Sequence, residues 1–147
     1  MIYTLKKGDF FKKTPLLLML CFCNGVYAQT PCAGLTGKIN NAQVKAINEN
    51  IARQLSSEMN VEVKNMQILS YFKEDNWSII YAETWVSDDP LRIYNGDLLT
   101  KNYIALFSGP VRVQDEDSMK QWVKEKAPAM PYKLAQCFLW YAKYRDN

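Results

Sequence analysis

The sequence has no histidine among its 147 residues. A Ser-His-Asp triad and a Cys-His pair both use an imidazole as the base, so neither arrangement is possible. The commonest zinc ligand is missing for the same reason. No glycine-rich phosphate loop is present either, because the nearest pair, Gly34 and Gly37, lacks the strand and helix that such a loop joins. We therefore expect no enzymatic activity, no cofactor and no metal; an enzyme with this sequence would depend on carboxylates, a Ser-Lys pair or tyrosine.

The first 28 residues have the pattern of a cleaved export signal. Four lysines and a short apolar run, residues 16–23, precede Val26 and Ala28, which stand at the two positions that a signal peptidase reads. Spanning a bilayer takes about 20 apolar residues, and this run is much shorter. We expect cleavage after Ala28 and a periplasmic or secreted product that begins at Gln29, with no membrane anchor.

Removal of this signal changes the charge and the cysteine content. The signal carries four lysines and Asp9, so the net charge of +3 falls to near zero for the rest of the chain. Nucleic-acid binding, which needs a concentrated positive surface, then has no support from composition. Cys21 and Cys23 leave with the signal. The remaining pair, Cys32 and Cys137, indicates one disulfide in an oxidising compartment, the alternative being two unpaired buried thiols.

Residues 29–147 are enough for one domain with one core. Its first element is an amphipathic helix. Asn40 is a good N-cap residue, Gln43 stands in the capping-box position, and Asn60 marks the end. Between them, apolar residues recur at helical spacing on one face: Val44, Ile47, Ile51, Ala52 and Leu55.

A hairpin follows, with strands at residues 61–73 and 77–86 joined through residues 74–76. In the second strand, side chains on both faces are apolar, β-branched or aromatic, which predicts a central strand covered on each side. One of these faces carries Trp77, Ile79, Tyr81, Glu83 and Trp85. The alternation of the first strand changes near Lys64 and Asn65, which predicts a β-bulge or a bend there.

The rest of the chain predicts two further strands and two helices. Residues 91–94 form a short strand that ends at the Asn95-Gly96 turn, and residues 102–107 form another. Asp115 caps the next helix and Pro128 ends it. Pro131 starts the last helix, in which one stripe is apolar: Leu134, Cys137, Phe138 and Tyr141.

This order of elements predicts an α+β domain. An N-terminal helix packs on an antiparallel meander sheet of three or four strands, and two C-terminal helices follow. In outline it resembles the cystatin-like or NTF2-like architecture. The resemblance is one of topology and implies no function.

Four residues are candidates for a binding site. Tyr81, Glu83 and Trp85 share a strand face, and a carboxylate among aromatic rings can bind a sugar or a cation. Tyr94 stands beside a tight turn, where we expect it to be displayed to a partner. The structural alternative for Glu83 is a pair with Arg92, Arg112 or a cross-strand lysine; the structural alternative for the aromatic residues is the core.

Loop carboxylates offer a further possibility. A two-carboxylate hydrolase or a calcium site would combine Glu83 with Asp88, Asp89 or Asp97. Their positions beside Pro90 and the Asn95-Gly96 turn are explained more simply by turn formation.

Taken together, these features predict an exported, disulfide-stabilised, non-enzymatic binding protein, such as an inhibitor or an immunity partner of a secreted protein. The alternatives are a small-ligand or glycan-binding domain and a carboxylate-dependent hydrolase. The expected partner is another exported protein or a small ligand, and the oligomeric state stays open.

Overall fold

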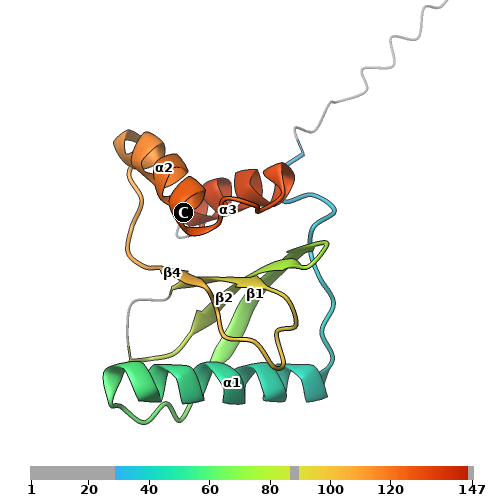
Figure 1. Cartoon of the computed structure of the whole chain (residues 1–147), viewed down its shortest axis with the longest axis vertical. Coiled ribbons are helices and arrows are strands. Elements are labelled where there is room, and N and C mark those ends of the chain that lie inside the picture. Colours follow the sequence, from blue (N-terminus) through green and yellow to red (C-terminus); the bar gives the residue numbers. More distant parts are fainter. Residues whose placement is uncertain (1–28, 87–89, 146–147) are drawn as a thin grey trace, which may run out of the picture.

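The computed structural model describes residues 29–86 and 90–145, and these form three layers (Figure 1). Helix α1 (Asn41–Met59) covers one face of a sheet, and α2 (Glu116–Lys126) and α3 (Tyr132–Tyr144) cover the other. The predicted signal peptide and the loop residues Asp88 and Asp89 lie outside the described residues.

The sheet is a four-stranded antiparallel meander in the order β1-β2-β3-β4. Its strands are β1 (Gln67–Glu74), β2 (Trp77–Glu83), β3 (Leu91–Asn95) and β4 (Ala105–Phe107), and a short 3₁₀ turn, η1 (Val113–Asp115), leads into α2. The predicted α+β arrangement, with a helix before the meander and two helices after it, is confirmed.

Several strand bounds differ from the prediction. β1 begins at Gln67, far later than residue 61, because β2 ends at Glu83, the residue opposite Gln67, and leaves nothing for earlier residues to pair with. The bulge lies between Ile68 and Ser70, so its predicted position near Lys64 is wrong. β4 is likewise shorter than predicted.

Helix α1 begins and ends where the sequence predicts. The Asn40 side chain accepts a hydrogen bond from the Gln43 amide, and the Gln43 side chain accepts one from the Asn40 amide, which completes the capping box. Asn60 ends the helix in the left-handed conformation, at φ 52°. Three apolar residues of its stripe are buried: Ile47, Ile51 and Leu55.

The central position of β2 is also confirmed. Every residue from Trp77 to Ala82 is buried, because alternate side chains enter two separate cores. The core under α1 includes Ile80, Ala82, Tyr94 and Leu98. The core under α2 and α3 includes Ile79, Tyr81, Leu91, Ile93 and Phe138. Two helical layers are therefore needed to bury this one strand.

A buried asparagine attaches the loop between β3 and β4 to α1. The Asn50 amide donates to the carbonyl oxygens of Leu98 and Lys101, at 3.2 and 2.7 Å. Its own oxygen accepts from Arg53 at 2.6 Å. Each of these polar groups is satisfied, as burial requires.

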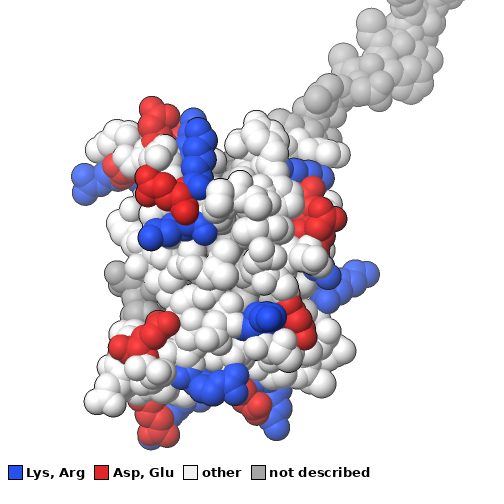
Figure 2. Space-filling view, viewed as in Figure 1, with Lys and Arg blue, Asp and Glu red and all other residues white. Residues whose placement is uncertain are grey.

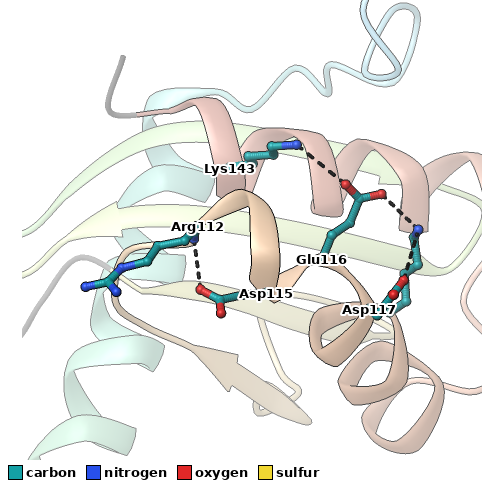
Figure 3. Close-up of polar contacts among 6 residues, drawn as sticks. Arg112, Asp115, Glu116, Asp117 and Lys143 are labelled. Carbon is teal, nitrogen blue, oxygen red and sulfur yellow. Dashed lines mark hydrogen bonds and ion pairs between the residues drawn. The ribbon is translucent and has the colours of Figure 1, made fainter.

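The start of α2 differs in detail from the prediction. The Asp115 carboxylate does not cap the helix, because it accepts from the Arg112 amide within the 3₁₀ turn (Figure 3). Glu116 instead makes ion pairs with Lys120 on α2 and Lys143 on α3, at 2.8 and 3.5 Å. These lysines lower the pKa of Glu116 below its usual range.

The predicted disulfide joins Cys32 to Cys137. It ties the N-terminal leader, residues 29–38, to α3, and the leader then runs along the sheet to α1 (Figure 1). Pro131 is the N-cap residue of α3, so the helix begins at Tyr132, one residue later than predicted. None of the helices within residues 29–86 and 90–145 is long and apolar enough to cross a bilayer.

Candidate functional site

The structure does not bring the four candidate residues together. Tyr81 and Tyr94 lie on opposite faces of the sheet, in different cores. The Tyr81 ring packs edge-on against Tyr141, with 5.7 Å between ring centres, and the Arg145 guanidinium lies 5.0 Å from the Tyr81 ring centre. The sheet face that carries Tyr81 is thus filled by α3 and forms no open concave surface.

Tyr94 is fully buried beneath α1, contrary to the expectation that it is displayed. Its ring meets Tyr103 edge-on at 6.2 Å. Burial raises the pKa of Tyr94 above its usual range, and nearby Arg92 offsets part of that rise. Its hydroxyl has no hydrogen-bond partner among the described residues. Asn95, in the turn, is exposed, but Tyr94 just before it is covered by α1.

Glu83 and Trp85 lie at the end of β2. Trp85 does not share the predicted strand face, because its backbone is left-handed, at φ 58°, and turns out of the strand. Its indole is 71% exposed. Such a backbone is a marked outlier for a bulky residue. Glu83, opposite Gln67, is half-buried and makes no ion pair with any described residue.

The loop carboxylates follow the structural alternative where the structure describes them. Asp97 accepts hydrogen bonds from the Leu99 amide and the Thr100 hydroxyl, as expected for a turn. No group of three or more acidic or cysteine side chains within residues 29–86 and 90–145 is placed to hold a metal ion. Charged side chains of both signs are mixed over α1 and α2 on the face shown in Figure 2.

No family model, curated protein or solved structure matches this chain. The cystatin-like or NTF2-like outline therefore rests on the order of the elements alone.

Sequence reasoning missed the outer edge of β1. The leader pairs with part of it: Thr36 lies opposite Phe72, the Gly37 amide donates to the Tyr71 carbonyl, and the Lys73 amide donates to the Leu35 carbonyl. The leader then turns away to α1. The remaining half of the edge, residues 67–70, has no strand beside it among the described residues. No local pattern signals which strand of a meander stays uncovered.

A groove of about 480 Å³ runs beside this uncovered half. Its walls are Ile39, which follows the leader, Val44 and Asn48 of α1, and residues 66–72. The bulge places Leu69 at its rim, with the side chain 41% exposed. The Asn48 amide donates to the Met66 carbonyl at 3.5 Å, but its oxygen receives no hydrogen bond from any described residue.

A larger cavity, about 550 Å³, lies at the other end of the sheet. The tip of the β1–β2 hairpin, the start of α1 and the turn after β3 line it. Its charged residues are two lysines and two aspartates: Lys38, Lys73, Asp75 and Asp97. This balance of signs favours no particular ionic ligand.

Proposed function

We propose that this protein is an exported, disulfide-stabilised binding protein without enzymatic activity, which recognises another exported protein as its inhibitor or immunity partner. The Cys32–Cys137 disulfide fits an oxidising compartment. The observation that carries the proposal is the position of Trp85.

Tryptophan is among the residues most enriched at the energetic centres of protein interfaces. Trp85 is 71% exposed, although the other tryptophans, Trp77, Trp122 and Trp140, are buried or half-buried. A left-handed backbone at a bulky residue costs about 1–3 kcal/mol, and such strain is concentrated at functional positions. The strained backbone at Trp85 thus lowers the stability of the fold, and it holds the indole outward at the end of the central strand β2.

The glycan-binding alternative has less support. It requires Tyr81, Glu83 and Trp85 to line a concave sheet face, and Tyr81 is only 8% exposed beneath α3. Of the two aromatic rings of this candidate site, only that of Trp85 is exposed and available to stack on a sugar. A single exposed indole suits a protein partner better than a glycan, because a partner protein can supply a pocket that encloses the ring.

The hydrolase alternative has no support from Asp97, the one of its three loop aspartates that the structure describes. Glu83 ends β2, whereas Asp97 follows Asn95, which pairs with Trp77 at the opposite end of that strand. The length of β2 separates the two carboxylates by roughly 20 Å. Glycoside hydrolysis needs its carboxylates about 5 to 10 Å apart.

The test is recovery of the partner. The full chain, exported and immobilised with its disulfide intact, is incubated with the exported proteins of its own host, and bound proteins are identified by mass spectrometry. We expect one stoichiometric partner whose affinity falls about tenfold or more with Trp85→Ala. Tyr132→Ala, which removes an exposed ring at the start of α3, is the matched control and leaves the affinity unchanged. Absence of a stoichiometric partner would overturn the proposal.

A further inference from the structure

The outer edge of β1 is half occupied by the chain itself. The leader adds to residues 71–73 as an antiparallel neighbour and uses the Tyr71 carbonyl and the Lys73 amide. This contact shows that the edge presents its backbone groups in the orientation that an added strand needs. The pairing between the leader and β1 stops at this point, because the chain turns away after Lys38 to begin α1.

The uncovered half, residues 67–70, lacks the devices that usually close an edge. Proteins cover edges or place charges and proline on them, since an open edge pairs readily with other chains. Gln67, Ile68, Leu69 and Ser70 carry no charge and no proline, and Leu69 is exposed. The bulge is the one feature here that limits pairing, because it bends the edge away from a flat geometry.

The groove beside this half has the chemistry of a peptide-binding site. Ile39, Val44 and Ile68 provide apolar surface beside the backbone of residues 67–70, which has no outer strand among the described residues. A segment in the groove would present alternate side chains to the apolar surface and backbone N–H groups to the outer carbonyls of this edge. Both needs are met by extended polypeptide and not by a compact small molecule.

We infer that residues 67–70 of β1 bind an extended segment of the partner protein, which adds to the sheet as a further strand beside the leader. This inference rests on the proposed function and assigns its surface. Trp85 lies at the same end of the sheet, because Gln67 pairs with Glu83 and Trp85 follows two residues later. One partner can therefore use the strand edge and the indole together.

A second copy of this chain fits the edge less well. Two rigid edges would have to pair along four residues bent by the bulge, and each copy's leader limits the overlap. A flexible segment follows a bent edge at lower cost. Four paired residues are also far from the roughly 1,200 Å² that a stable interface between folded copies buries.

The test uses random peptides of about ten residues, which at roughly 3.3 Å per residue are long enough to pass the open edge. They are displayed on phage and selected against the full exported chain with its disulfide intact. We expect enriched peptides with apolar residues at every second position. Leu69→Asp weakens their binding about tenfold or more, whereas Ile104→Asp, at an exposed apolar residue beside β4, changes it less than about twofold.

A methylation scan of the best peptide identifies the binding mode without altering the protein. Methylating one backbone N–H at a time should abolish binding at every second position, because only those groups face β1 in an added strand. Uniform tolerance of methylation would overturn the inference, as would failure to enrich any peptide that Leu69→Asp excludes.

Two other outcomes also reject strand addition. If sedimentation shows a dimer that Leu69→Asp converts to a monomer, the edge is occupied by a second copy. If the exported partner is recovered, depends on Trp85 and is indifferent to Leu69→Asp, the proposed function stands and the β1 site is wrong.

Discussion

The two edges of the sheet are closed to different extents. β4 is only three residues long, and the Gln54 side chain holds the segment just before it: its oxygen accepts from the Tyr103 amide at 3.3 Å and its nitrogen donates to the Tyr103 carbonyl at 3.5 Å. The Tyr103 hydroxyl donates to Glu58 at 2.6 Å. At β1, eight residues long, the leader covers only the half near the hairpin tip.

Helix α1 contributes to both edges from opposite sides of one buried stripe. At 3.6 residues per turn, Asn50, Gln54 and Glu58 lie on one side of this stripe, towards β4. Val44 and Asn48 lie on the other side, where they line the groove beside β1. On one side, the polar side chains of this helix thus hold the segment that leads into β4; on the other side, the helix lines a groove beside the uncovered half of β1.

The largest effect should come from freeing the leader that covers half of β1. Replacing both Cys32 and Cys137 with serine removes a cross-link between residues 105 positions apart. The free energy of unfolding should fall by on the order of 4 kcal/mol, measured by urea denaturation. In the folded variant, hydrogen exchange of the Lys73 amide should accelerate more than that of the β3 amides. Unchanged protection of Lys73 would mean that the disulfide does not hold the leader on the edge.

Gly37→Ala should displace the leader locally. A Cβ at this position would overlap the Tyr71 ring, so the leader or the ring has to move. We expect a loss of about 2 kcal/mol in urea denaturation, typical of overpacking. Thr36→Ala, at the exposed neighbouring position, is the control and should cost much less. Equal losses would show that the close approach of Gly37 to Tyr71 does not matter.

Gln54→Ala should loosen the segment that leads into β4. The lost hydrogen bonds with Tyr103 should reduce the free energy of unfolding by about 1 kcal/mol in urea denaturation. Gln121→Ala removes an exposed helical contact to Glu125 and serves as the control. Hydrogen exchange of the Tyr103 amide should accelerate in the Gln54 variant and stay unchanged in the control. Equal exchange in the two variants would mean that Gln54 does not hold this segment.

The smallest effect should come from Glu116, which lies away from both edges. Its pKa is lowered in the folded state, so this group stabilises the fold at pH values above the usual glutamate range, and the contribution is lost as the pH falls through the folded-state pKa. Glu116→Gln should lower Tm slightly at neutral pH, and the difference from wild type should vanish in acid. A difference that grows on acidification would contradict this sign.

The features that sequence reasoning predicted are those with local causes. The capping box at Asn40 and the left-handed Asn60 depend on neighbouring residues, and the apolar character of both faces of β2 is visible within seven residues. The order of helix, meander and two helices followed from such signals. The disulfide followed from cysteine count and the predicted export.

The candidate site was harder to predict because exposure depends on what covers each residue. Tyr94 stands beside a turn, yet α1, more than thirty positions earlier in the sequence, buries it. Trp85 leaves the strand without the glycine or asparagine that usually marks a left-handed backbone. The β1 edge depends on a contact between Thr36 and Phe72, which no short sequence window contains.

Asn50 has a consequence for the order in which the fold assembles. The loop between β3 and β4 obtains two of its hydrogen bonds from this α1 side chain, so these two bonds form only once the helix has docked against the sheet. The β1–β2 hairpin, in contrast, joins residues close in sequence, so its formation has a small entropic cost of loop closure. Folding should therefore proceed outward from the hairpin, with β4 as the last strand to be added and the first to be lost when the protein begins to unfold.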